Sequence, residues 1–347
     1  MAALEAAAAP DAASASDGAE TLAALAALDV AEPDAAVFEA SDARRAEEVV
    51  ALEAAAAATW VRGASAEELV ASSVLRCGAK GRVEILEASP RLAESLRAIT
   101  AADDGESLAA AVAQIAPLVD AAAFDAGRSG CVLLRNTSAA LLPQLCAALG
   151  ALRKAPAAVA DGALPLGNDV DHQGQDLAAI ALACDVPPMR GGAIQLTRSD
   201  AVCRALSHNG RAALTRAVPY KAGDAAGAAP LISVDACGGA SLKFSRALRD
   251  NVEWSDDVDE TVLEALAEAA LHADALCFAL PLRRGDVLVL DAARWLWGRA
   301  EVPPNDHGAV WFNGNWTPPR AVPPNALQAA PTGAVLVHAT FQRRPPV

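Results

Sequence analysis

Short apolar runs recur along the chain from about residue 115 onward. Each run is rich in Val, Ile, Leu or Ala, and Gly, Pro or Asp residues flank most of them, which is the pattern of buried β-strands. The predicted strands are GCVLLR (130–135), AAIALACDV (178–186), GAIQLT (192–197), PLISVDAC (230–237), DVLVLD (286–291) and AVWFNGNW (309–316).

Three segments between these strands have helical spacing instead. Apolar residues recur three and four positions apart in 138–153, 199–216 and 259–274, so we predict helices there. Strands that bracket helices, with connections rich in Pro and Gly, are typical of an α+β protein built on a β-sandwich.

The N-terminal third shows helical spacing in 21–28, 43–59 and 65–75. The sequence SAEELV at 65–70 matches a capping box followed by an apolar residue, which favours a helix start. Residues 1–20 contain mainly Ala, Ser and Asp, which bury too little apolar surface to offset chain entropy. The predicted organisation is therefore a disordered segment (1–20), a helical N-terminal region (21–114) and a main domain (115–347).

Composition narrows the classes of partner. The 347 residues are 53% hydrophobic, which is ample for a sizeable core. The formal charge is −15, and the first 59 residues supply −10 of it, from 12 acidic and 2 basic side chains. Lys and Arg are scattered over the rest of the chain, so we predict no nucleic-acid partner.

The cysteines and the apolar runs bear on the compartment. The seven cysteines lack CxxC spacing and several lie in apolar runs, so we expect reduced core thiols. Every apolar run of 18 residues contains charges, so we predict no membrane span and a cytoplasmic protein. The Ala- and Ser-rich N-terminus leaves plastid or mitochondrial targeting open, although it carries acids and no Arg before Arg44.

Four sequence blocks follow one another in an order that matches a known family. They are AGRSGCVLLRNTS (126–138), DVPPMRGGAIQL (185–196), LRRGDVLVLDAARWLWGR (282–299) and GAVWFNGNW (308–316). Together they resemble the taurine dioxygenase-like (TauD/TfdA) group of Fe(II)- and 2-oxoglutarate-dependent oxygenases. The resemblance implies a double-stranded β-helix, the jelly-roll or cupin-like core, flanked by helices.

The resemblance also places the family's metal ligands. Such enzymes hold Fe(II) with a His-x-Asp or His-x-Glu pair and a distal His, leaving positions open for 2-oxoglutarate and dioxygen. The proximal pair falls on LPLGNDVDHQ, so that Gly167 takes the His position and Asp169 the acid position. The distal His position falls on Trp297. Two of the three family ligands are therefore replaced by residues that offer no metal-binding atom.

The positions that would bind 2-oxoglutarate are also substituted. Family members usually have a Thr on the strand after the Gly-Gly turn, and Ile194 stands there. They also use an Arg that makes two charge-assisted hydrogen bonds to the cosubstrate carboxylate. That position falls near Asn313, and the sequence has no Arg between Arg299 and Arg320.

Other residues offer a replacement ligand set. His172 lies three residues after Asp169, and His307 lies ten residues after Trp297. A joint site of Asp169 and His172 needs a bulge or a turn in the polar NDVDHQGQD segment, because the two side chains point to opposite faces of a strand. The alternative is that His172 and His307 are solvated loop residues, with His338 in a strand.

Two further features have a structural and a functional interpretation. Four tryptophans near the C-terminal end either fill the core or line an apolar ligand pocket. They are Trp295, Trp297, Trp311 and Trp316. Asp286 is expected to hold a turn before its strand, and Arg283 and Arg284 are expected to be an exposed pair.

The favoured hypothesis is a catalytically degenerate protein of the dioxygenase fold that acts in binding or regulation. It is expected to need no cofactor and has room for a small-molecule ligand. A second hypothesis is an active oxygenase of a small polar or carboxylate-bearing substrate, using Fe(II), 2-oxoglutarate and the ligands Asp169, His172 and His307. The third is an enzyme that uses the retained pocket without iron. The sequence does not define the oligomeric state.

Overall fold

The computed structural model describes residues 35–77, 80–125, 127–158, 163–168, 179–185, 187, 191–222, 225–234, 239–244, 259–300, 311–312, 315–316 and 336–343. The segment 1–20 and the helix predicted over 21–28 lie outside these residues. The chain divides into two units, Met1–Ala51 and Leu52–Val347. Helix α2 (Ala35–Gly63) spans the division, and it confirms the helix predicted over 43–59. The elements below all belong to the second unit.

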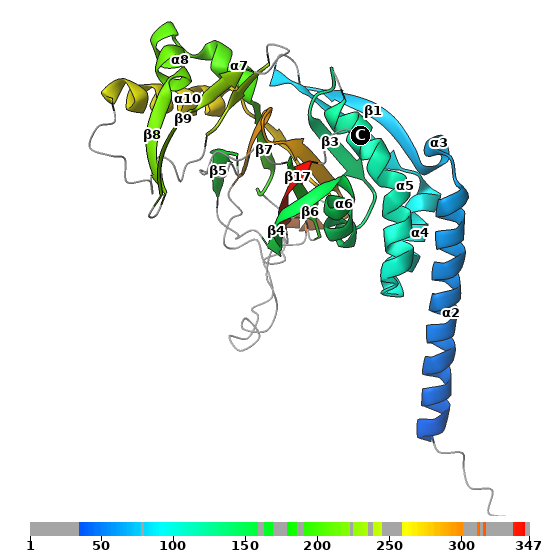
Figure 1. The fold of residues 1–347 in the computed structure, drawn as a ribbon. Helices are drawn as coiled ribbons and strands as arrows, with labels where there is room; N and C mark the ends of the chain where they lie inside the picture. Colours follow the sequence, from blue (N-terminus) through cyan, green and yellow to red (C-terminus); the bar gives the residue numbers. More distant parts are fainter. Residues whose placement is uncertain are drawn as a thin grey trace, which may run out of the picture. The chain divides into compact units, whose positions relative to one another are not determined.

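A seven-stranded sheet forms one layer of this unit (Figure 1). In spatial order its strands are β1 (Val70–Arg76), β2 (Arg82–Ala88), β3 (Cys131–Arg135), β13 (Val287–Asp291), β6 (Ala179–Cys184), β17 (Leu336–Arg343) and β4 (Gly150–Ala158). Neighbouring strands are antiparallel except β2 and β3, which are parallel. Strands far apart in sequence lie side by side, as in a jelly roll.

A four-stranded antiparallel sheet forms the second layer. Its strands, in spatial order, are β12 (Phe278–Leu280), β7 (Ile194–Arg198), β14 (Trp295–Arg299) and β5 (Leu164–Gly167). Three two-stranded ribbons complete the described strands. They are β8 (Ala217–Ala222) with β9 (Ala225–Pro230), β10 (Ile232–Val234) with β11 (Ala240–Leu242), and β15 (Trp311–Phe312) with β16 (Asn315–Trp316).

The inner faces of the two large sheets share one apolar core. Side chains alternate between the faces of a strand, and in β13 Leu288 and Leu290 point into this core while Val287 and Val289 belong to the core on the other face. The four-stranded sheet contributes a matching set of buried side chains: Ile194, Leu196, Leu280, Trp295 and Trp297. We call this set and its partners from the seven-stranded sheet the inter-sheet core. Two facing sheets around one core confirm the predicted β-sandwich.

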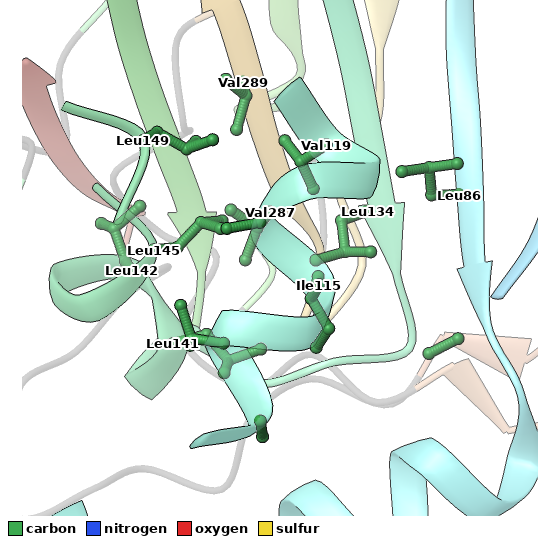
Figure 2. Close-up of a cluster of buried hydrophobic side chains, with 14 of the residues drawn as sticks. Leu86, Ile115, Val119, Leu134, Leu141, Leu142, Leu145, Leu149, Val287 and Val289 are labelled. Carbon is green, nitrogen blue, oxygen red and sulfur yellow. The ribbon is translucent and has the colours of Figure 1, made fainter. Parts of the chain in front are cut away.

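Helices α4 (Pro90–Ala101), α5 (Gly105–Phe124) and α6 (Leu142–Leu149) cover the outer face of the seven-stranded sheet. Figure 2 shows Ile115 and Val119 of α5 close to Leu134 of β3 and to Val287 and Val289 of β13. By length and composition α5 could cross a membrane. It instead buries an apolar face on the sheet, which is the behaviour of a core helix in a folded domain.

Helices α7 (Ser199–Ala205), α8 (His208–Thr215) and α10 (Glu260–Leu276) cover the outer face of the four-stranded sheet. The Thr197 hydroxyl donates a 2.8 Å hydrogen bond to the Ala273 carbonyl oxygen, which ties β7 to α10. The layers therefore run helix, sheet, sheet, helix, and the predicted α+β class is confirmed.

Most of the predicted elements are confirmed. Strands β3, β6, β7 and β13 coincide with four of the predicted runs. The runs 230–237 and 309–316 contain the shorter strands β10, β15 and β16. The helix predicted over 259–274 is α10, and the one predicted over 199–216 is divided into α7 and α8 at Leu206 and Ser207.

Two predictions near the N-terminus are corrected. The helix predicted over 65–75 is wrong beyond its first turn: the capping box at Ser65 starts α3 (Ala66–Leu69), and the chain continues as β1 from Val70. Val74 is β-branched and β1 pairs with β2 at every residue, so cross-strand pairing outweighs helical spacing here. The region 21–114 therefore supplies two strands of the main sheet, and the boundary placed at residue 115 falls within α5.

The helix predicted over 138–153 is also too long. A short 3₁₀ turn, η2 (Ala139–Leu141), precedes α6, and α6 ends at Leu149. The next residue, Gly150, has an extended backbone and begins β4, which pairs with β17. The helix ends at a glycine, and the strand that begins there is fixed by pairing with β17, which is distant in the sequence. The local spacing of apolar residues therefore did not predict this helix end.

Candidate functional site

Strand β14 brings two of the family-site positions together. It lies between β5 and β7, and Trp297 is directly opposite Gly167 on one side and Leu196 on the other. Directly opposite residues in antiparallel strands share a face of the sheet. Residue 167 therefore belongs to the same inner face as the Trp297 side chain, although 130 residues separate the two positions.

Trp297 is buried, with 3% of its surface exposed, and its side chain belongs to the inter-sheet core. Around it that core consists of apolar side chains from both sheets, among them Leu196, Ile180 and Leu288. An indole nitrogen donates a hydrogen bond and has no lone pair for a metal. The sequence therefore supplies apolar volume at the position where the resemblance places a histidine ligand.

Asn168, directly after Gly167, fixes the end of β5. Its side-chain amide donates to the Leu242 carbonyl oxygen at 2.6 Å and to the Ala292 carbonyl oxygen at 3.2 Å. Its side-chain oxygen accepts a hydrogen bond from the Phe244 backbone amide at 2.9 Å. The backbone amide of Asn168 donates in turn to the Phe244 carbonyl oxygen at 2.8 Å. Sequence reasoning missed this residue, because its partners lie 74 to 124 positions away.

Ile194, at the position of the family's Thr, is 1% exposed and belongs to the inter-sheet core. It is opposite Arg299 of β14 and opposite Leu280 of β12. Its side chain has no atom that can donate or accept a hydrogen bond, so it cannot orient a carboxylate as a hydroxyl would.

Trp295 shares the inner face of β14 with Trp297. Its indole nitrogen donates to the Ser129 carbonyl oxygen at 2.8 Å, and its ring meets Phe278 edge to face, with centroids 6.0 Å apart. Gly81 has a φ of +143°, and a Cβ there would lie 2.8 Å from the Trp295 ring. These contacts confirm core filling for Trp295, whereas the side chains of Trp311 and Trp316 lie outside the described part.

Arg299 is the charged residue of the inner face of β14, and it is 1% exposed. Its charge acts on Cys184, at the end of β6 in the other sheet. Burial raises the pKa of the Cys184 thiol to about 11, nearby Asp286 and Asp185 add to the rise, and Arg299 opposes it. This shift favours the neutral thiol over the thiolate at physiological pH.

Asp286 holds the turn before β13, as the sequence predicts. Its Oδ2 atom accepts from the Arg283 backbone amide at 2.9 Å, and the residue is 1% exposed. Burial raises the pKa of its carboxyl group above the usual 3.8, against the opposing effects of the Arg283 amide and Arg135. Arg283 and Arg284 are exposed, as expected for a turn pair.

Four of the predicted site positions lie outside the described residues: Asp169, His172, His307 and Asn313. The strand that contains His338 is described, but its side chain is not. Within the described part of the chain, no group of three or more His, Cys, Asp or Glu side chains is arranged to hold a metal ion.

The residues at the described family positions do not fit an iron ion with its 2-oxoglutarate. Gly167 has no side chain and the Trp297 indole has no lone pair, so neither can replace a histidine ligand. Ile194 has no hydroxyl group, so it cannot make the hydrogen bond to 2-oxoglutarate that the resemblance implies for a threonine at this position. Strand β14 pairs with β7 in regular register through Trp297, whereas its pairing with β5 shifts register between Trp297 and Arg299, directly after the Trp297–Gly167 pair.

No protein-family model matches the chain, and no curated protein matches it either. Solved structures do match. The non-heme iron oxygenase OrfP in complex with Fe has a TM-score of 0.50 and 12% identity, over 75% of this chain and 93% of that one. An OrfP variant in complex with (3S)-hydroxy-L-Arg has a TM-score of 0.51 and 13% identity, over 74% and 93%. PvcB from Pseudomonas aeruginosa has a TM-score of 0.48 and 16% identity, over 80% and 95%.

The OrfP matches cover 93% of the length of that protein. Because the sequence identity is only 12% and 13%, these matches are evidence for the fold and not for the function. Together with the two facing sheets and their helices, they confirm the resemblance to the taurine dioxygenase-like oxygenases at the level of the fold. The chain has the double-stranded β-helix fold of the non-heme iron oxygenases.

Proposed function

We propose that this protein is a cofactor-defective form of the oxygenase fold, which acts by binding a ligand or partner and not by iron-dependent oxidation. The observation that carries the proposal is the pair formed by Trp297 and Gly167 on adjacent strands. Both family histidine positions face the same interior, and neither residue has a ligand atom.

Packing supports the same conclusion. Where a histidine ligand is missing, a water molecule or another side chain could coordinate the metal instead, provided that the space around the position stayed open. Here the Trp297 indole is 3% exposed and lies in the apolar inter-sheet core, together with Ile194 and Leu196. A metal ion among these described side chains would lose its hydration and gain no ligand from them, which costs far more than apolar contacts return.

A fold can survive the loss of its chemistry because core and site make separate demands on the sequence. The two sheets are held by apolar side chains and by the hydrogen bonds of Asn168 and Trp295, none of which involves a metal. A protein of this fold without metal chemistry would keep a stable scaffold, and its surfaces could still bind a ligand or partner. A small-molecule ligand is the proposed class of partner, and thermal-shift screening of small carboxylates would detect it, since a ligand of the native state raises Tm.

The test is 2-oxoglutarate turnover by the full-length protein supplied with Fe(II), ascorbate and dioxygen, with succinate measured by mass spectrometry. The expected result is no succinate above the protein-free background. Trp297→Phe serves as a matched variant, because it also lacks a ligand atom and should be equally inactive. Succinate formation by the wild type would overturn the proposal and favour an active oxygenase with ligands such as Asp169, His172 and His307.

A further inference from the structure

Strand β1 lies at one end of the seven-stranded sheet (Figure 1). Only Val70 is buried, and residues 71–76 are all exposed. Two of them are apolar: Val74 is 47% exposed and Leu75 is 38% exposed. No described strand lies beyond β1, so the backbone groups on its outer edge are available to another strand.

The sequence of β1 lacks the features that protect edge strands. Native proteins blunt such edges with Pro, Lys, bulges or inward-pointing charges. The strand reads VASSVLR, with its single charge, Arg76, at the end. Its pairing with β2 is regular over seven consecutive residues, without a bulge. A regular, mostly uncharged edge of this length is suited to pairing with a further strand.

A hollow lies beside the strand, on the side of helix α5. It has a volume of about 340 Å³, and its lining includes Ser72 and Val74 of β1 with Leu118, Ala121 and Ala122 of α5. Apolar side chains of α5 line the hollow together with the charged residues Glu67, Glu84 and Arg128. A strand added next to β1 would place its own side chains at the border of this space.

We propose that β1 pairs antiparallel with β1 of a second copy of this chain, with Ser73 opposite Ser73. This register places Val74 opposite Ser72 of the other copy, and Leu75 opposite Ala71 of the other copy. Each large apolar residue therefore meets a small one, and the two serine hydroxyls meet on the symmetry axis. Such self-complementarity is what a two-fold interface requires.

Charge also favours a second copy over an unrelated extended peptide. Antiparallel pairing brings Arg76, at the end of one strand, next to the start of the other strand, where helix α3 carries Glu67 and Glu68. Glu68 is held by Ser65 in the capping box, so Glu67 is the exposed carboxylate that remains for Arg76. The two-fold axis repeats this contact, so the dimer would contain two Arg76–Glu67 ion pairs.

The test uses the full-length protein in sedimentation-velocity experiments. The wild type is expected to form dimers, and Ser73→Lys and Ser73→Glu are each expected to be monomeric. Two like charges directly opposite one another should weaken the dimer by about tenfold or more. An equimolar mixture of the two variants should recover the dimer, because Lys and Glu then meet on the axis.

Leu271→Lys is the matched control, since Leu271 is 72% exposed on helix α10 and the change adds the same charge. It should leave the wild-type dimer intact. A monomeric wild type would overturn the proposal and leave the edge to another occupant. A dimer that survives Ser73→Lys, or variants that do not recombine in the mixture, would place the interface elsewhere.

Discussion

The two tryptophans of β14 share a strand and a face, yet their surroundings differ in how strongly they specify the residue. Trp295 donates a hydrogen bond to Ser129, meets Phe278 edge to face and packs against Gly81, where a larger residue would not fit. Trp297 lies opposite Gly167, at a position where the resemblance places a histidine ligand. The contacts of Trp295 specify a tryptophan for the fold, whereas Trp297 is expected to stand where a residue served chemistry alone. On that expectation, a ligand position can change identity while its strand keeps its place in the sheet.

The largest expected effect belongs to the Trp295 site. Trp295→Ala should lower the free energy of unfolding by about 3–5 kcal/mol, because it leaves a large cavity and an unpaired Ser129 carbonyl. Urea denaturation followed by circular dichroism measures this. Leu271→Ala, at an exposed position of α10, should change stability by less than about 0.5 kcal/mol. Equal effects of the two changes would mean that Trp295 is not specified by its contacts.

A smaller effect is expected beside the metal position. Asn168→Ala should cost about 2–3 kcal/mol, because the buried Leu242 carbonyl and the Phe244 amide lose their partner in one change. Asn168→Asp keeps the acceptor for the Phe244 amide and, while its carboxyl is protonated, one O–H donor in place of two N–H donors, so it should cost less than Asn168→Ala at low pH. Unchanged stability in Asn168→Ala would show that β5 is held without this clamp.

The smallest effect concerns pH. Burial raises the pKa of the Asp286 carboxyl in the folded state above 3.8, so this group stabilises the fold at low pH and loses that contribution as pH rises through the folded pKa. Asp286→Asn keeps an acceptor for the Arg283 amide and cannot ionise. The variant should therefore gain stability relative to the wild type as pH increases above about 4. A difference that stays constant from pH 3 to 7 would contradict the direction of the shift.

Sequence reasoning succeeded where a pattern reports burial on both faces of a strand. The runs at β3, β6 and β13 are apolar without interruption because each strand has a core on either side. Strand β7 instead alternates, with Ile194 and Leu196 in the inter-sheet core. Strand β1 was predicted as a helix for the opposite reason. Its residues are mostly exposed, so its spacing carries no information about burial, and only its partner β2 fixes the conformation.

The site could be predicted only in part. The order of four motif blocks suggested Gly167 and Trp297 as the two histidine positions, and the structure pairs them across adjacent strands. Their assignment to a former metal site stays a prediction. Asn168 was not foreseen, because an asparagine beside an apolar strand is equally typical of a loop, and its three partners come from distant segments.

We propose that the fold has lost its metal site through two residues, Gly167 and Trp297. Anaerobic titration calorimetry with Fe(II) tests it most directly, on the wild type and on Gly167→His combined with Trp297→His. Directly opposite residues have Cβ atoms about 4.5–5.5 Å apart, so two histidines there can reach one ion, with Asp169 as the predicted third ligand. We expect no Fe(II) binding by the wild type or by either single variant, and binding by the double variant. Tight stoichiometric Fe(II) binding by the wild type would contradict it.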